Sequence, residues 1–261
     1  MATVDDLTPL LKRLRLSGVL QTLSLRCQQA IDEKLTYEQF LYRLLSDEVE
    51  RRDAATLQRR LRAAQFEQLK TLEQFDFSFN PQVPRGRIIE LASCAFVERH
   101  QVVLFIGPAG TGKSHLAQAL GHQACRVGYK VLFRSARQML AELRAARADN
   151  SYVQCIDRLA RVDLLIVDDV GLHPMHPPEP TDLYEVIRAR YERGATIMTS
   201  NRAIDEWYPL FGDPLLAGAA LDRLLHHAQI IELQGDSYRN PPPAKRAQRT
   251  VQQDQRANSS G

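Results

Sequence analysis

The residues whose types and spacing best suit chemistry form one short loop with the pattern Gly-x-x-x-x-Gly-Lys-Ser. Its members, together with the histidine that follows, are Gly107, Pro108, Ala109, Gly110, Thr111, Gly112, Lys113, Ser114 and His115. An apolar, β-branched run precedes the loop and a helical pattern follows it, which is the setting that this pattern needs. Glycines let backbone N–H groups approach phosphate oxygens, and the start of a helix adds unpaired N–H groups and a positive dipole end. The spacing therefore predicts a binding site for a nucleoside triphosphate.

Two side chains of this loop have defined parts in phosphate chemistry. The Lys113 ammonium can reach the β- and γ-phosphates, and the Ser114 hydroxyl can bind Mg²⁺. A glycine-rich turn can match the pattern by chance, but here a predicted strand and a predicted helix flank it as well. We therefore expect a nucleotide that is bound together with Mg²⁺.

A pair of carboxylates ends a second apolar run. Residues 164–167 are wholly apolar, and Asp168 and Asp169 follow them directly. Such runs suit central strands of parallel sheets, whose carboxyl ends lie beside a phosphate loop. We expect Asp168 to hold Mg²⁺, directly or through water, and Asp169 to orient and deprotonate the attacking water. The alternative is a pair of aspartates that only begins a turn before Gly171.

Two further residues fall where a nucleotide site needs polar groups. Asn201 follows the strand predicted at 195–200, at the level of the γ-phosphate, and can hydrogen-bond that phosphate or the attacking water. Arg223 lies in an otherwise apolar helical stretch. Its guanidinium can pair with Asp222 in the same subunit, or reach the γ-phosphate of a neighbouring subunit as an arginine finger. Spacing alone does not choose between these two roles.

These residues need a frame of strands and helices to bring them together. The periodicity predicts strands at 101–106, 129–134, 163–168, 195–200 and 229–233. It predicts helices near 113–127, 136–148, 151–160, 181–193, 203–211 and 215–227. This alternation indicates an α/β fold with one parallel sheet and helices on both of its faces. Arg137, Arg144 and Arg147 in the second of these helices face solvent, or contact DNA phosphates.

Residues 5 to about 75 are predicted to be helical throughout. Apolar residues recur there at helical spacing, and Thr36 with Gln39 can form a capping box. Arginines crowd the stretch 43–62 among acidic residues, which favours a solvated helix face with Glu/Arg pairs over a phosphate-binding or subunit surface. An aromatic, proline-marked segment at 75–84 follows and is expected to be extended. We therefore divide the chain into a helical domain at 1–75, a nucleotide-binding domain at 76–239 and a disordered basic tail at 240–261.

Composition excludes several classes of protein. The chain has 261 residues, of which 44% are hydrophobic and 25% charged, so it can bury a sizeable core. No apolar run reaches the length of a membrane span, and the N-terminus lacks the pattern of a signal peptide. The four cysteines are scattered, which predicts reduced thiols in a cytoplasmic protein. The net charge of +3 falls in 240–261, so DNA binding by the folded part would need local clusters of basic residues.

Taken together, four stretches resemble the AAA+ ATPases. They are 107–114, 164–169, 199–201 and 221–224, at the Walker A, Walker B, sensor 1 and arginine-finger positions. More narrowly, the chain resembles the IstB/DnaC-like branch, and within it the IstB transposition helpers. The stretches that carry this narrower likeness are 70–77, 222–227 and 235–239, and the resemblance runs from about residue 5 to residue 239.

The resemblance implies a AAA+ P-loop core with a five-stranded parallel sheet, a small helical N-terminal domain and no full lid domain. It implies an ATPase that hydrolyses ATP to ADP and phosphate, in a homo-oligomer whose ATP sites lie between subunits and are completed by Arg223. It also implies assembly on double-stranded target DNA, which is bent and delivered to a partner transposase of the integrase type. Hydrolysis would disassemble the helper or stimulate the transposase.

The chain departs from the wider AAA+ pattern at two places. Asp169 stands where many AAA+ proteins carry glutamate, and little sequence follows the last predicted strand, so a sensor 2 role is absent or falls to Arg239. Two other functions suit the same fold. One is a helicase loader of the DnaC type, which acts on single-stranded DNA and a protein partner. The other is a nucleotide-gated DNA scaffold with negligible turnover.

Overall fold

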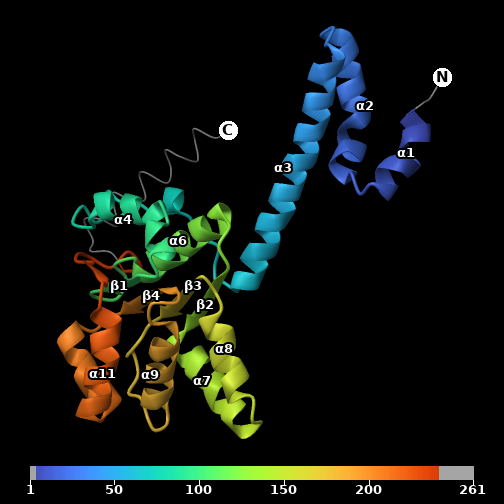
Figure 1. The fold of residues 1–261 in the computed structure, drawn as a ribbon. Coiled ribbons are helices and arrows are strands. Elements are labelled where there is room, and N and C mark those ends of the chain that lie inside the picture. Colours follow the sequence, from blue (N-terminus) through green and yellow to red (C-terminus); the bar gives the residue numbers. More distant parts are fainter. Residues whose placement is uncertain (1–3, 241–261) are drawn as a thin grey trace. The chain divides into compact units, whose positions relative to one another are not determined.

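The computed structural model describes residues 4–240, which fall into two compact units that divide at residue 60 (Figure 1). The division lies inside a long helix, whereas the sequence-based domain boundary was placed at residue 75. The predicted disordered tail lies, from residue 241 onward, outside the described residues.

One parallel sheet forms the centre of the larger unit. Within residues 61–240 its strands are β1 (Val102–Ile106), β2 (Val131–Ser135), β3 (Leu164–Asp168), β4 (Ala195–Ser200) and β5 (Gln229–Glu232). The order across the sheet is β2-β3-β4-β1-β5, and each pair is parallel. All five strands lie within two residues of their predicted positions. The predicted α/β fold is therefore confirmed.

Helices cover both faces of this sheet. One face carries α4 (Arg85–Ala92) and α6 (Lys113–Val127), and the other carries α7 (Ala136–Ala148), α8 (Tyr152–Ala160), α9 (Glu179–Arg190) and α11 (Pro214–Leu225) (Figure 1). Shorter helices are α5 (Ala95–Glu98) and α10 (Tyr208–Phe211), with 3-10 turns at Leu72–Gln74 and Ile204–Trp207. Alternate strand residues face opposite sides. Leu104, Leu132 and Leu165 thus pack in the core beneath α7, α8 and α9.

Two sequence-based expectations for this unit were wrong in detail. The helix expected at 203–211 is split into a 3-10 turn and α10, because Pro209 lacks the N–H group that a continuous helix would use there. The segment at 75–84 was expected to be extended, but it folds into short turns. In one of these turns the Asp76 carboxylate accepts hydrogen bonds from the N–H and hydroxyl of Ser78.

The smaller unit is an antiparallel arrangement of three helices, α1 (Val4–Arg13), α2 (Ser17–Asp32) and the first part of α3 (Tyr37–Ala64). Its buried core consists of Val19, Leu23 and Leu44. The predicted capping box at the start of α3 is present. The Thr36 N–H donates to Gln39 Oε1 at 3.0 Å, and the Gln39 N–H donates to Thr36 Oγ1 at 3.3 Å.

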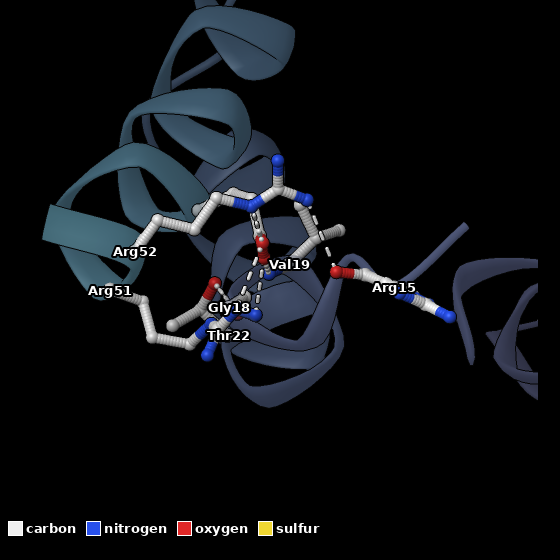
Figure 2. Close-up of polar contacts among 7 residues, drawn as sticks. Arg15, Gly18, Val19, Thr22, Arg51 and Arg52 are labelled. Atoms are coloured by element: carbon white, nitrogen blue, oxygen red, sulfur yellow. Dashed lines mark hydrogen bonds and ion pairs between the residues drawn. The ribbon is translucent and has the colours of Figure 1, made fainter. Parts of the chain in front are cut away.

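A buried glutamate fastens α3 to the start of α2. Glu48 is 3% exposed and accepts hydrogen bonds from the backbone N–H groups of Gly18 and Val19, which lie in the first turn of α2. Arg51 and Arg52 also donate to its carboxylate, at 3.1 and 2.6 Å (Figure 2). Burial alone would raise the pKa of Glu48, but these hydrogen bonds lower it to about 2. The carboxylate therefore caps α2 from another helix.

The thiols of the chain differ in exposure between the two units. Cys94, Cys125 and Cys155 of the larger unit are buried, and Cys27 of the smaller unit is half-buried. All four are free. Burial raises the pKa of the Cys94 thiol to about 11. Among the described residues, no helix is long and apolar enough to span a membrane.

Candidate nucleotide-binding site

The predicted phosphate loop joins β1 to α6. Gly107 has φ 136°, and a Cβ there would lie 2.0 Å from the carbonyl oxygen of Leu233. Gly112, the residue before α6, has φ 103°, and a Cβ there would lie 2.6 Å from the Phe75 ring. No L-side chain suits both the conformation and the space at either position. The glycines that the sequence pattern singled out are thus required by this loop.

Lys113 is the first residue of α6, and its side chain turns back into the loop. Its ammonium donates to the carbonyl oxygens of Gly107 and Pro108, both at 2.8 Å, and the residue is 4% exposed. Burial lowers the pKa of Lys113, while the charges of Asp169 and Asp168 oppose this shift. Thr111 closes the loop by donating its hydroxyl to Pro108 O at 2.9 Å. The structure therefore places a positive charge inside the loop.

His115, in the first turn of α6, directs its ring elsewhere. Its Nε2 lies 3.1 Å from the carbonyl oxygen of Thr71, and its ring meets the Phe75 ring edge-on at 5.3 Å. Burial lowers the pKa of His115, which favours the neutral imidazole. The side chain therefore holds the segment before β1 against α6.

The two predicted acids lie at the same edge of the sheet as the loop. In the strand register Asp168 pairs with Ser135, and Ser200 pairs with Ile106, the residue before the loop. Asp168 is 4% exposed. Burial and the neighbouring charge of Asp169 raise the pKa of Asp168, although hydrogen bonds with Thr199 and Ser114 oppose them. The site thus holds a buried carboxylate whose negative form the protein itself does not favour.

One hydroxyl organises both acids. Thr199, fully buried in β4, donates its Oγ1–H to Asp168 Oδ1 and accepts the backbone N–H of Asp169 at 2.9 Å. The Asp169 backbone has φ 57°, in the left-handed region that aspartate tolerates better than most residues. From the sequence, a role at the polar end of this strand was predicted for Asn201 but not for Thr199. A threonine among the apolar residues of a central strand was the available signal for this contact.

Asn201 follows β4 directly beside the loop, because the Gly107 N–H donates to the carbonyl oxygen of the preceding residue, Ser200, at 3.2 Å. Its side chain is half-buried, and it makes no hydrogen bond with the described part of the chain. The structure therefore brings Asn201 to the edge where it was expected.

The residues at this edge fit a magnesium ion. Mg²⁺ prefers oxygen ligands, and here the Ser114 hydroxyl lies against the Asp168 carboxylate. Within residues 4–240, no arginine or lysine forms an ion pair with Asp168, and its pKa is raised. A cation at this position would stabilise the ionised carboxylate. The oxygen atoms of Ser114 and Asp168 are therefore suited to binding Mg²⁺.

Arg223 lies at the other edge of the sheet. Together with Val102 and Thr196, near the starts of β1 and β4, it lines a cavity, whereas the phosphate loop follows the end of β1. Its guanidinium donates to Ala219 O at 2.9 Å and lies 5.7 Å from the centre of the Tyr184 ring. Within the described residues it forms no ion pair, so the pairing with Asp222 considered above is not formed. Arg223 is therefore not part of the phosphate site that this chain forms.

Two of the three arginines in α7 have internal partners. Arg144 pairs with Glu179, and Arg147 donates to the fully buried carboxylate of Asp182. Both acids belong to α9. These ion pairs fasten α7 to α9. The contacts therefore account for Arg144 and Arg147 without the contact with DNA phosphates that was considered from the sequence.

Comparison with known proteins gives a consistent result. A family model described as IstB-like ATP-binding protein matches residues 9–246. A protein of Pseudomonas aeruginosa, named as an ATP-binding protein of insertion sequence IS21, is 38% identical over 236 residues, which cover 90% of this chain and 89% of the relative. A Mycobacterium tuberculosis protein, named as ATP-binding and belonging to an insertion sequence, is 41% identical over 92% of this chain and 95% of its own length.

Solved structures resemble this chain in fold. AMPPCP-bound DnaA from Aquifex aeolicus has a TM-score of 0.54 at 22% identity, over 67% of this chain and 53% of that one. DnaI has a TM-score of 0.54 at 20% identity, over 63% of this chain and 91% of that one. With the phosphate loop and the strand order, these likenesses confirm the AAA+ P-loop fold.

Proposed function

Because the chain belongs to the family of IstB-like ATP-binding proteins, we propose that it is an ATP-dependent DNA-binding helper of transposition. It binds MgATP, assembles on double-stranded target DNA, recruits or stimulates a partner transposase, and hydrolyses ATP. The observation that carries the nucleotide chemistry is the edge where Lys113, Ser114 and the buried Asp168 meet. The relatives' names, which combine ATP binding with insertion sequences, support the role in transposition.

The mechanism follows from the positions of the acids and the loop. The loop's N–H groups and Lys113 bind the phosphates, and Mg²⁺ held by Ser114 and Asp168 would neutralise charge on the β- and γ-phosphate oxygens when bound. Asp169, whose backbone is fixed by Thr199, accepts a proton from the attacking water. The bond from the γ-phosphorus to the bridging oxygen breaks as the bond to water forms, which leaves ADP and phosphate. Asn201 positions the γ-phosphate or the water.

The place of Arg223 supports an oligomer with shared sites. A guanidinium at the edge opposite the phosphate loop can meet a γ-phosphate only in a neighbouring subunit. Such a contact joins two different surfaces and repeats from one subunit to the next. Assembly would also line up many weakly basic surfaces along one DNA, so that a nearly neutral folded part can bind duplex DNA.

Mixing two inactive variants tests the shared site. We expect Lys113→Ala and Arg223→Ala each to lower DNA-stimulated ATPase activity about a hundredfold. An equal mixture should recover about a quarter of the wild-type rate, because random neighbours then rebuild one intact site in four. Full activity and assembly of Arg223→Ala alone would contradict the shared-site mechanism.

The strand preference of the assembled protein tests the wider function. Particle mass and binding to fluorescent duplex and single-stranded DNA would be measured with ATP, with ADP and without nucleotide. Large ATP-dependent particles on duplex DNA are expected. A preference for single strands would instead favour a helicase loader, and DNA binding gated by ATP without measurable turnover would favour a scaffold.

A further inference from the structure

The cavity beside Arg223 is lined mainly by basic side chains. It has a volume of about 190 Å³ and lies at the ends of α9 and α11 and the starts of β1 and β4, at the edge of the sheet opposite the phosphate loop. Of the described residues that line it, Glu192 alone is acidic. The basic ones are Arg99, His100, Arg190, Arg223, His226 and His227. The cavity is therefore suited to a negatively charged group.

Arg190 lines this cavity as a buried cation without an ion-pair partner. It is 2% exposed, and its guanidinium donates to the carbonyl oxygens of Leu159 and Val162, at 2.7 and 3.0 Å, and to Thr196 Oγ1 at 3.0 Å. Burial lowers the pKa of Arg190 to about 10, against the opposing charge of Asp163. The side chain is still charged at neutral pH, and within residues 4–240 it pairs with no carboxylate. The wall of the cavity therefore carries a positive charge that no ion pair neutralises.

Two tyrosines at α9 contact two basic residues at the end of α11, the helix packed beside it (Figure 1). The Arg223 guanidinium lies 5.7 Å from the centre of the Tyr184 ring, and the Tyr191 hydroxyl lies 2.9 Å from His226 Nδ1. Tyr184 and Tyr191 are seven residues apart and Arg223 and His226 three apart, and both spacings place side chains on one face of a helix. One side of α9 thus holds a guanidinium and an imidazole near each other at the cavity.

The contact with Tyr191 fixes the ring of His226 and leaves its second nitrogen available. The Tyr191 hydroxyl also hydrogen-bonds with Glu192; burial, and after it the charge of Glu192, raise the pKa of Tyr191. A hydroxyl that donates to a carboxylate can accept the Nδ1–H of an imidazole, and a protonated imidazole then donates from Nε2 as well. His226 Nε2 has no partner within the described residues, and His226 is exposed. This nitrogen can therefore meet an anion that another molecule brings to the cavity.

We propose that His226 acts together with Arg223 on the terminal phosphate of the nucleotide bound by a neighbouring subunit, and that Tyr191 is the positioning residue for His226. The inference rests on the shared site proposed above. The protonated imidazole adds a second positive charge and donates a hydrogen bond from Nε2 to a γ-phosphate oxygen, where it stabilises the transition state. His226 takes no proton in the reaction, because the proton of the attacking water passes to Asp169. The rate of hydrolysis would thereby follow the charge of one histidine.

Mixing of variants tests whether His226 acts on a neighbour. We expect His226→Ala to lower DNA-stimulated ATPase activity about tenfold. An equal mixture with Lys113→Ala should show about a quarter of the wild-type rate, against about a twentieth if the two variants did not share sites, because one interface in four then has every group intact. A mixture of His226→Ala with Arg223→Ala should show no such gain, since both substitutions remove a group from the same side of the interface.

The dependence on pH separates a direct role of His226 from a structural one. The ratio of the wild-type rate to the His226→Ala rate should fall as the pH rises from about 6 to about 8, because the imidazole loses its charge in this range. His226→Gln, which keeps a polar side chain, should give the same trend. The ratio cancels the titration of the nucleotide and of the other groups at or beside the cavity. These groups are Arg99, His100, Arg190, Tyr191, Glu192, Asp222, Arg223 and His227.

The positioning role of Tyr191 has its own readout. Tyr191→Phe keeps the ring and removes the hydroxyl, so it should lower the rate about threefold and cause no further loss when it is added to His226→Ala. His227→Ala is the matched control. His227 is an exposed histidine at the same cavity, and its ring stacks on His226 at 4.0 Å but has no hydrogen-bond partner within residues 4–240. Its loss should change the rate less than twofold, and the thermal midpoint of each variant shows whether it is folded.

The failure of this inference is distinguishable from a failure of the shared site. If Lys113→Ala and Arg223→Ala restore activity to each other while Lys113→Ala and His226→Ala do not, the shared site stands and the role of His226 is wrong. A wild-type rate in His226→Ala, a rate ratio that does not change with pH, or an equal loss in His227→Ala would also overturn it. Additive effects of Tyr191→Phe and His226→Ala would overturn the positioning role. If Lys113→Ala and Arg223→Ala do not restore activity to each other, the shared site fails and this inference fails with it.

Discussion

Glu48 in the smaller unit and Asp168 in the larger unit are both buried among polar partners, but their pKa values shift in opposite directions. Glu48 and Asp168 are 3% and 4% exposed. Hydrogen bonds from two arginines and two backbone N–H groups overcome the burial of Glu48 and lower its pKa to about 2. At Asp168 burial prevails, and the negative charge of Asp169 adds to it, so the pKa is raised. Burial alone therefore does not distinguish a structural acid from a functional one.

The difference lies in what supplies the compensating charge. Glu48 receives it from Arg51, Arg52 and the start of α2, all within the helical unit. Among residues 4–240, only the hydroxyls of Thr199 and Ser114 donate hydrogen bonds to Asp168, and a hydroxyl stabilises a negative charge less well than a cation does. An acid left in this state destabilises the fold, which is common where a site must bind a cation.

Asp168→Asn should give the largest effect, and it should affect activity without loss of stability. Loss of the carboxylate removes the predicted Mg²⁺ ligand, so we expect ATPase activity to fall at least about a hundredfold. Removal of a buried charge that is poorly compensated should leave the free energy of unfolding unchanged or raise it by about 1 kcal/mol. Denaturant unfolding beside steady-state ATPase assays measures both. A marked loss of stability would make Asp168 a structural acid like Glu48.

Glu48→Gln should have the opposite pattern, with a loss of stability and little effect on nucleotide binding. The neutral amide leaves Arg51 and Arg52 without their anion and weakens the cap on α2, which should cost about 3 kcal/mol in the helical unit. Hydrogen exchange of the α2 amides should accelerate in the full-length protein, while nucleotide affinity should stay within about twofold. Glu50→Gln, an exposed acid on the same helix, serves as the control. Unchanged exchange in Glu48→Gln would mean that the helix ends hold without this carboxylate.

Glu48 and Asp168 should become protonated at different pH values, so lowering the pH should affect the two sites one after the other. The pKa of Glu48 is lowered from 4.5 to about 2, so its contribution to stability is full above about pH 4.5 and is lost as the pH falls toward 2. The pKa of Asp168 is raised above 3.8, so protonation there begins at a higher pH and stabilises the nucleotide-free fold. As the pH is lowered, Mg²⁺-dependent binding of a non-hydrolysable ATP analogue should therefore weaken at a higher pH than the one at which the α2 amides lose their protection from hydrogen exchange. Binding without Mg²⁺ controls for protonation of the nucleotide, and simultaneous loss of both signals would contradict the comparison.

Local sequence patterns were sufficient for the parts of the site that are contiguous in the chain. The loop at 107–114, the acidic end of β3 and the order of strands and helices follow from spacing and periodicity, and the family resemblance was confirmed. Contacts between distant residues were not predictable in this way. The two hydrogen bonds between Asn80 and Asp236 join residues 156 positions apart, and no local pattern records them. Glu48 was assigned to a solvated helix face because its spacing resembles that of its exposed neighbours.

The location of Arg223 is a second example of a contact that could not be predicted from the sequence. Its sequence context allowed a partner in its own subunit or in a neighbour, since periodicity does not say at which edge of a sheet a helix ends. The fold places it beside the starts of β1 and β4, away from the loop. Only the three-dimensional arrangement could show that the ion pair with Asp222 is not formed.

The four cysteines differ in exposure, so their reactivity can be used to follow local opening of the protein. A thiol reagent at neutral pH should modify Cys27 readily, because this thiol is half-buried in the small unit. It should modify the three buried thiols of the larger unit only when that unit opens. The raised pKa of Cys94 slows its reaction further. The modification rates of the three buried thiols, followed by peptide mass, would thus record the opening of the larger unit in one unlabelled, unmutated sample, with Cys27 as the reference for an accessible thiol.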